Sequence, residues 1–202
     1  IVTIKRCNET ITFNSNEIYV PKSIKDCKLE LNPGKYPHWT LKEIHEQIDS
    51  SLRAISLGGR LLSNNKVKLG GLNEHNSELV DINNLILLGC GTSYFAGLHS
   101  LEFFRELSNF DNVTLYDGAD FVQNCIPKSG KTALVLLSQS GETQDLYRCL
   151  RIAQEHNLFT IGVVNVVDSL IAREVDCGCY LNAGREVGVA STKAYTSTVI
   201  IL

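Results

Sequence analysis

The sequence lacks the features that mark several large classes of protein. Its apolar runs fall far short of the roughly 20 residues that a membrane-spanning helix needs, and its first residues alternate polar and apolar instead of forming the apolar core of a signal peptide. Basic residues are not clustered, and 19 of them stand against 22 acidic ones, which gives a formal net charge of -3. We therefore expect a soluble, cytoplasmic protein that binds neither membranes nor nucleic acid.

The cysteines form no recognisable site. They are odd in number and widely scattered, they include no CxxC pair, and no histidine lies near them at the spacing of a zinc site. We expect free thiols, most of them buried, and no bound metal. The cysteines are Cys7, Cys27, Cys90, Cys125, Cys149, Cys177 and Cys179.

Neither end of the sequence resembles the natural end of a fold. The chain begins without Met, and it stops at Ile200–Leu202 inside an apolar helical run that has no cap. Its 202 residues are enough for one sizeable hydrophobic core and leave little room for a second. We expect an excised piece of a longer protein.

Residues 1–37 predict a small β-rich segment followed by a linker. Ile1–Ile4 and Glu9–Phe13 have the composition of strands, and turn-forming residues separate them. Prolines at positions 21, 33 and 37 close the segment, which is too small to bury a core of its own.

A helix is predicted from Thr40 to Ile55. Apolar residues return there at three- and four-residue spacing, and Thr40 and Glu43 stand in the relation of a capping box.

From residue 85 onward, strand and helix patterns alternate. Leu85–Leu88 is a continuous apolar run that ends at Gly89, which is typical of a strand buried on both faces of a parallel sheet. The alternation predicts an α/β fold: a three-layer α/β/α sandwich around a parallel sheet of about five strands. The expected strands are 85–88, 113–116, 133–137, 160–164 and 179–181, and the expected helices are 94–107, 119–124, 143–156, a short one around Leu170 and a last one from near Thr192.

Three turns rich in hydroxyl side chains follow strands of this predicted sheet. Gly89–Ser93 follows the first strand, Ser138–Thr143 the third and Gly188–Thr192 the fifth. In open parallel sheets, ligands bind beyond the carboxyl ends of the strands, where helix N-termini present backbone N–H groups and the positive end of the helix dipole. The turns therefore predict a cradle that holds phosphate oxygens with uncharged donors.

Ordinary helix capping is the alternative explanation of each turn, because Ser and Thr are favoured N-cap residues. It is weakest for Ser138–Thr143, where three hydroxyls and an amide lie within six positions although one cap is enough for a helix. A GxxxxGK[ST] loop is missing, and Gly89–Gly91 lacks the third glycine of the dinucleotide fingerprint. A phosphorylated sugar therefore fits this pattern better than a nucleotide.

Several motifs resemble one known family. Cys90–Tyr94, Ser138–Thr143 and the long motif Asn182–Ser197 resemble the sugar isomerase (SIS) domain of the isomerising glutamine:fructose-6-phosphate aminotransferases. Leu41–Gln47 is similar to the segment that joins the glutaminase half of these enzymes to the isomerase half, and Val67–Leu72 is similar to the eukaryotic-type members. The resemblance implies that residues 38–202 are the first SIS domain, with a flavodoxin-like fold, and that residues 1–37 are the tail of a glutaminase-like domain and a linker.

The resemblance also implies a reaction and a set of contacts. Family members make glucosamine 6-phosphate from fructose 6-phosphate and the ammonia of glutamine, on the route to UDP-N-acetylglucosamine, without a metal or an organic cofactor. They are cytoplasmic homodimers that pair through the SIS domain, and their catalytic Lys, Glu and His belong to a second lobe, so no catalytic residue is expected in this chain. The implied contacts are Thr92, Ser93, Ser138, Gln139, Ser140 and Thr143 for the phosphate and nearby hydroxyls, and Val189, Ala190 and Ser191 for the sugar.

Four residues beside these turns each allow two interpretations. A helix N-terminus would lower the pKa of Cys90 and make it reactive, but a buried thiol without a catalytic role is the interpretation that we favour. Glu142 is either a base beside the sugar or a carboxylate that compensates a helix dipole. Glu186 and Lys193 indicate a structural ion pair or a dimer contact.

Two other functions stay open at this stage. The first is a non-enzymatic sensor, in which a SIS domain binds a sugar phosphate and regulates a partner. The second is a stand-alone aldose–ketose isomerase, which would need catalytic residues that the sequence does not offer.

Overall fold

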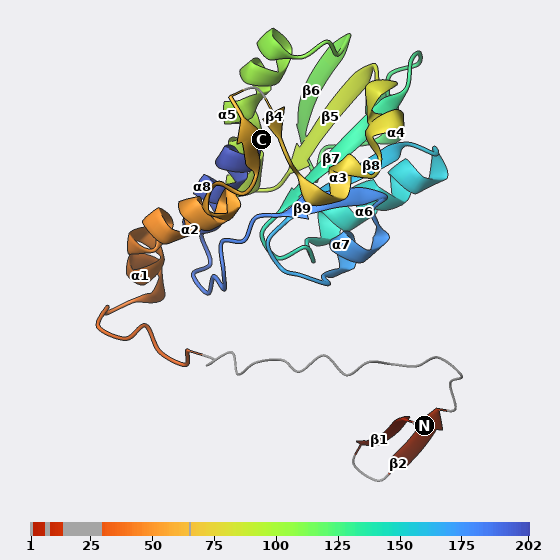
Figure 1. Cartoon of the computed structure of the whole chain (residues 1–202). Coiled ribbons are helices and arrows are strands. Elements are labelled where there is room, and N and C mark those ends of the chain that lie inside the picture. Colours follow the sequence, from red (N-terminus) through yellow and green to blue (C-terminus); the bar gives the residue numbers. More distant parts are fainter. Residues whose placement is uncertain (1, 7–8, 14–29, 65) are drawn as a thin grey trace. The chain divides into compact units, whose positions relative to one another are not determined.

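The structure is a computed structural model that describes residues 2–6, 9–13, 30–64 and 66–202 of the chain (Figure 1). The chain divides into two compact units, Ile1–Asn32 and Pro33–Leu202. In the first unit, β1 (Val2–Arg6) pairs antiparallel with β2 (Glu9–Phe13), as the predicted β-rich segment requires. Cys7, Cys27 and Pro21 lie outside the described residues, and the origin of this segment in a glutaminase-like domain stays a prediction.

The second unit is built on a parallel sheet of five strands, which confirms the predicted fold class. The strand order is β6-β5-β7-β8-β9, and every neighbouring pair is parallel. Each predicted run lies in one of these strands, although the last strand ends one residue earlier than expected. The strands are β5 (Asn84–Gly89), β6 (Asn112–Asp117), β7 (Thr132–Ser138), β8 (Phe159–Val164) and β9 (Cys177–Tyr180).

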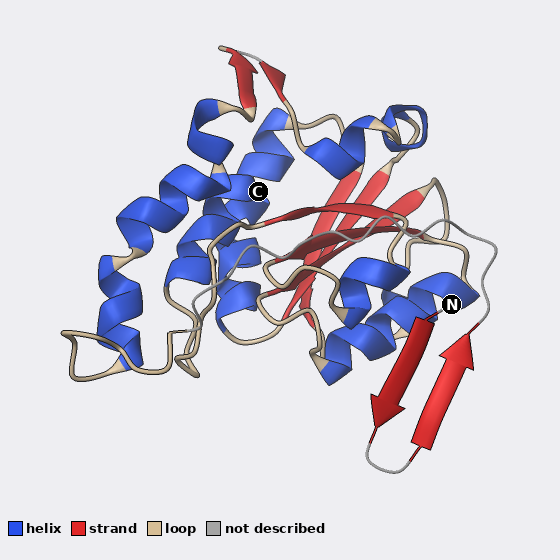
Figure 2. Ribbon diagram, turned by 60° about the horizontal axis from the view of Figure 1, so that its bottom comes forward, coloured by secondary structure: helices blue, strands red, loops and turns tan. Residues whose placement is uncertain are grey.

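Helices cover both faces of the sheet and produce the three predicted layers (Figure 2). Leu85 and Leu87 of β5 point to one face, whereas Ile86 and Leu88 point to the other, and all four are buried. Every residue of β5 and of β7 is buried, which explains the unbroken apolar runs Leu85–Leu88 and Ala133–Leu137 inside them. The first face packs against α3 (Gly70–Asn73), α4 (Asn76–Val80), α5 (Thr92–Leu107) and α8 (Lys193–Ile201), and the second against α6 (Gln144–Glu155) and α7 (Leu170–Glu174).

The helix predicted at residues 40–55 is divided into α1 (Trp39–His45) and α2 (Gln47–Ala54), and its predicted capping box is wrong. The N-cap of α1 is His38, so Thr40 already lies inside the first turn, where its side chain is not in a capping position. Glu43 is turned away from the helix start and is buried, with an exposed fraction of 1%. Its hydrogen-bond partners lie in a distant loop, as described below.

Two other regions differ from the prediction. The helix expected at 119–124 is wrong, since the structure has only the short 3-10 turn η2 (Gln123–Cys125) there. The side chain of Arg148 on α6 donates hydrogen bonds to the carbonyls of Gly118, Ala119 and Phe121, and these contacts hold the segment as a loop. Residues 56–80 were not assigned and contain η1 (Ser56–Gly58), the exposed hairpin β3 (Leu61–Ser63) and β4 (Lys66–Val67), α3 and α4.

No helix within the described ranges is both long enough and apolar enough to cross a membrane.

Candidate functional site

The first two hydroxyl-rich turns leave neighbouring strands at the same edge of the sheet. β5 and β7 are paired in parallel, with Gly89 opposite Leu137, and neighbouring strands lie about 4.8 Å apart. After the first turn α5 begins with Gly91 as its N-cap, and after the second α6 begins with Thr143 as its N-cap. The sheet therefore brings two helix N-termini to one edge, where backbone N–H groups and dipoles favour an anion.

The Ser138–Thr143 turn is stabilised by its own hydroxyl groups. Ser138 Oγ accepts the N–H of Gly141 at 2.9 Å and lies 3.2 Å from Thr143 Oγ1. Ser140 Oγ accepts the N–H of Glu142 at 3.1 Å. Since the serine oxygen is the acceptor in that bond, the hydroxyl hydrogen of Ser140 can still be donated to a ligand.

Ordinary capping does not account for these hydroxyls. The N-cap residues of α5, α6 and α8 are Gly91, Thr143 and Thr192, and none of the three makes a side-chain capping hydrogen bond. Thr92, Ser93, Gln139 and Ser140 are all half-buried, so they are partly accessible at the surface. The N-cap side chains themselves therefore do not cap these helices, whereas the hydroxyls of Ser138 and Ser140 stabilise the turn that precedes α6.

The segment that begins α7 holds the second turn in place. The N–H of Ile171 donates to the carbonyl of Gly141 at 3.0 Å, and the N–H of Leu170 donates to Glu142 Oε1 at 2.8 Å. Gly141 has a φ of +67°, and a Cβ at that position would lie 1.9 Å from Ser169 Oγ. Glu142 thus caps a different helix from the one that it precedes, a role that neither interpretation of its sequence position included.

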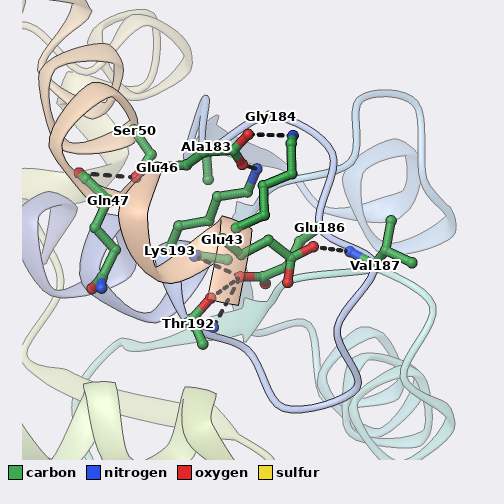
Figure 3. Close-up of polar contacts among 12 residues, drawn as sticks. Glu43, Glu46, Gln47, Ser50, Ala183, Gly184, Glu186, Val187, Thr192 and Lys193 are labelled. Atoms are coloured by element: carbon green, nitrogen blue, oxygen red, sulfur yellow. Dashed lines mark hydrogen bonds and ion pairs between the residues drawn. The ribbon is translucent and has the colours of Figure 1, made fainter. Parts of the chain in front are cut away.

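The third turn is anchored differently from the first two. Val189 and Ala190 are exposed, and Ser191 Oγ donates to Glu186 Oε2 at 2.8 Å. Glu186 Oε1 also accepts the N–H of Thr192 at 2.9 Å, so this carboxylate caps the start of α8 (Figure 3). Glu186 therefore has a capping role that its sequence position did not suggest, and its part in a dimer contact stays a prediction.

Lys193 does form a structural ion pair, and its partner is Glu46 between α1 and α2. Lys193 Nζ lies 2.6 Å from Glu46 Oε2, and Lys42 Nζ lies 2.5 Å from Glu46 Oε1. Burial alone would raise the pKa of Glu46, but the hydrogen bonds and charges of Lys193 and Lys42 outweigh it and hold that pKa below its ordinary value.

The loop before α8 is also bound by α1 and α2 (Figure 3). Glu43 accepts the backbone N–H groups of Val187 and Gly188, and Arg53 donates to the carbonyls of Asn182 and Ala183 at 3.1 and 2.9 Å. None of these contacts is predicted from the sequence. No local pattern could have revealed them, because the partners are more than 120 residues apart.

The described cysteines are free thiols, as predicted, and three of the five are buried. Burial, and then the nearby Asp117 carboxylate, raise the pKa of the Cys90 thiol. This direction is opposite to the one that a helix N-terminus would produce, and it supports a thiol without a catalytic role. Among the described residues, no group of three or more His, Cys, Asp or Glu side chains could hold a metal ion.

A hollow of about 470 Å³ lies beside the first turn. Its lining includes Gly91, Tyr94, Tyr116, Asp117 and Asp120, and it contains none of the predicted contact residues. Two carboxylates would repel a phosphate, so this hollow is not the predicted cradle.

Comparison with known proteins gives the family. Residues 78–202 match the SIS domain. The chain belongs to the SIS domain family. Among relatives, it is 43% identical over 195 residues to a "probable glutamine–fructose-6-phosphate aminotransferase [isomerizing]" of Acanthamoeba polyphaga mimivirus, a match that covers 96% of this chain and 31% of the relative. The corresponding aminotransferase of Saccharomyces cerevisiae is 40% identical over 185 residues, which cover 90% of this chain and 25% of the yeast protein.

Solved structures of SIS-type proteins agree with this assignment. The C-terminal domain of glucosamine-fructose-6-phosphate aminotransferase from Francisella tularensis superposes with a TM-score of 0.72 at 28% identity, covering 84% of this chain and 47% of the other. The SIS chain described here spans a third or less of the length of the two curated relatives above. The enzymatic activity of these full-length relatives is therefore only proposed for this chain.

Proposed function

We propose that this SIS domain is the first sugar-phosphate-binding lobe of an isomerising glutamine–fructose-6-phosphate aminotransferase, and that it binds fructose 6-phosphate or glucosamine 6-phosphate. The observation that carries the proposal is the pair of uncapped helix N-termini behind the Ser138–Thr143 and Gly89–Ser93 turns, on adjacent strands. The similarity to aminotransferases over 96% of the chain supports the enzyme over a non-enzymatic sensor.

In the proposed complex, uncharged donors hold the phosphate. Thr92, Ser93, Ser138, Gln139, Ser140 and Thr143 would contact the phosphate and nearby hydroxyls, and Val189, Ala190 and Ser191 would contact the sugar. A phosphate monoester carries about -1.5 to -2 charges at pH 7, so the N–H groups and hydroxyls would form charge-assisted hydrogen bonds with it. The chain itself would supply binding, and the chemistry would need residues of the complete enzyme.

Two further parts of the proposal concern the surroundings of the domain. Free thiols at the described cysteines support the cytoplasm as its location, since disulfides are rare there. We also propose a homodimer through this domain. Phe95, Leu98, Phe103 and Leu107 are exposed apolar residues of α5 that such a contact could bury, and sedimentation velocity at two protein concentrations measures the association.

Binding is tested with single hydroxyl deletions in the 202-residue chain. Thr92→Ala and Ser140→Ala should each raise the dissociation constant of glucosamine 6-phosphate roughly 10- to 150-fold, because a hydrogen bond to a charged group contributes about 1.5 to 3 kcal/mol. Isothermal titration calorimetry measures the constant. The chain alone should bind the ligand without producing it from fructose 6-phosphate and ammonia.

The matched control is Ser100→Ala. Ser100 lies on α5, like Thr92, but it is buried and its hydroxyl donates to the carbonyl of Ala96 at 3.1 Å. This variant should bind glucosamine 6-phosphate as the unchanged chain does. If the unchanged chain does not bind either sugar phosphate at saturating concentration, the proposed function is wrong.

A further inference from the structure

Glu43 is an unusual carboxylate for a surface helix. It lies on α1 and has an exposed fraction of 1%, although α1 itself is a short helix near the start of the second unit. A buried carboxylate is costly unless hydrogen bonds satisfy it. Among the described residues, the hydrogen-bond partners of Glu43 are backbone groups and not a cation: its Oε1 accepts from Val187 and Gly188, and its Oε2 accepts from Gly188 at 3.1 Å.

The loop is shaped to receive this carboxylate. A Cβ at position 188 would lie 2.6 Å from Glu43 Oε2 and 3.0 Å from Thr40 Oγ1. A side chain at position 188 would therefore separate the loop from the Glu43 carboxylate, by moving one or the other. Gly188 therefore provides both the N–H donor and the space that the contact needs.

The contact lies at the start of the third turn, Gly188–Thr192. Val189 and Ala190 follow Gly188, and both are exposed, so burial does not hold them. Glu43 binds the backbone just before these two residues, and Glu186 binds Ser191 and Thr192 just after them. The two carboxylates therefore hold the chain on both sides of the exposed residues; Figure 3 shows Glu43 and Glu186 with Val187 and Thr192.

We propose that Glu43 is a positioning residue for the sugar end of the ligand, a role that rests on the proposed function. It holds the 187–191 loop in the conformation that meets the sugar, whereas the phosphate is held by the first two turns. When a loop spends only a fraction of its time in the binding conformation, the apparent affinity falls by that fraction. Loss of the Glu43 contact therefore weakens the binding of a sugar phosphate and leaves the binding of phosphate alone unchanged.

The test uses two variants that break the same contact from opposite sides, Glu43→Gln and Gly188→Ala. Glu43→Gln keeps one acceptor oxygen. Gly188→Ala keeps the backbone N–H donor, but its methyl group occupies the space next to the Glu43 carboxylate. Each should raise the dissociation constant of glucosamine 6-phosphate at least 10-fold and change that of inorganic phosphate less than 2-fold. NMR titration measures both ligands, and hydrogen exchange should show faster exchange of the Val187 and Gly188 amides.

The control is Asp176→Asn. Asp176 Oδ2 also accepts two hydrogen bonds, from the N–H and the hydroxyl of Thr160, but at the opposite edge of the sheet, where β8 and β9 begin. This variant should bind both ligands normally. Gly188→Ala changes only a surface loop, so it decides the question if Glu43→Gln does not fold.

The outcomes separate the two proposals. If the unchanged chain binds glucosamine 6-phosphate and both variants bind it equally well, the role of Glu43 is refuted while the proposed function stands. Equal weakening of glucosamine 6-phosphate and inorganic phosphate would also refute it, because the effect would then be a general loss of structure. Failure of the unchanged chain to bind either ligand would refute the proposed function itself.

Discussion

The ion pair between Lys193 and Glu46 gives an asymmetric prediction. The Lys193 side chain is 4% exposed, whereas that of Glu46 is 27% exposed and also contacts Lys42. Glu46→Gln leaves a buried ammonium without a charged partner, which should cost about 3 to 5 kcal/mol of unfolding free energy. Lys193→Met leaves a carboxylate that water and Lys42 still stabilise, so the expected cost is smaller, about 1 to 3 kcal/mol.

The double variant Glu46→Gln/Lys193→Met tests whether the two effects share one interaction. It should be destabilised by clearly less than the sum of the single variants, because the Lys193 ammonium that Glu46→Gln leaves without its carboxylate is absent from it. Urea unfolding followed by circular dichroism gives the three values, provided that the slope of the free energy against urea stays constant. Additive effects, or a larger cost for Lys193→Met than for Glu46→Gln, would refute the asymmetry.

The same pair predicts a dependence on pH. The folded-state pKa of Glu46 lies below its unfolded value, which is about 4.3. Its contribution to stability is therefore present above the unfolded pKa and is lost as the pH falls through the folded pKa. The difference in stability between the unchanged chain and Glu46→Gln should be largest near neutral pH and should shrink below about pH 4. A difference that stays constant down to pH 3 would contradict this explanation.

Two further predictions concern the turns and their supports. Gly141→Ala should lower the unfolding free energy by at least about 2 kcal/mol, measured with urea, because its Cβ would collide with Ser169 Oγ in addition to the strain of a positive φ. Gly34→Ala is the control, since Gly34 also has a positive φ but a Cβ there would meet nothing within 4 Å. Arg148→Met should cost about 1 to 3 kcal/mol, because three loop carbonyls lose the guanidinium as a donor and, among the described residues, only that of Gly118 keeps another, the thiol of Cys149. Arg151→Met should change stability by less than about 0.5 kcal/mol, since Arg151 is exposed and donates to the side chain of Gln154 on the same helix. Equal effects of the two variants would contradict the role of Arg148.

The sheet was predictable because its signal is local. A strand covered on both faces must be apolar at every position, and Leu85–Leu88 has that composition within four residues. The glycine and hydroxyl residues that directly follow a strand are also a local signal, so the first two turns, Gly89–Ser93 and Ser138–Thr143, could be located from the sequence as well. The exposed hairpin at 61–67 has no such signal, because none of its strand residues is buried.

The hydrogen bonds that hold the turns in place could not be predicted, because their partners lie far apart in the sequence. The Thr40–Glu43 spacing has the pattern of a capping box, yet the buried position of Glu43 follows from a loop 144 residues away. Phe121 likewise lies in a segment with helical spacing, but Arg148 binds its carbonyl from α6. In both cases a long-range hydrogen bond outweighs a local preference that contributes about 1 kcal/mol or less.

The size of the folded unit follows from these long-range contacts. The first two turns need only the sheet and α7, all of which lie within the matched SIS domain at residues 78–202. The third turn and α8 also need Glu43 and Glu46, which precede that domain. Without α1 and α2, Lys193 would be left without Glu46 and the loop before α8 without Glu43. The physical unit that forms the proposed site therefore begins ahead of Trp39, and this agrees with the single compact unit Pro33–Leu202.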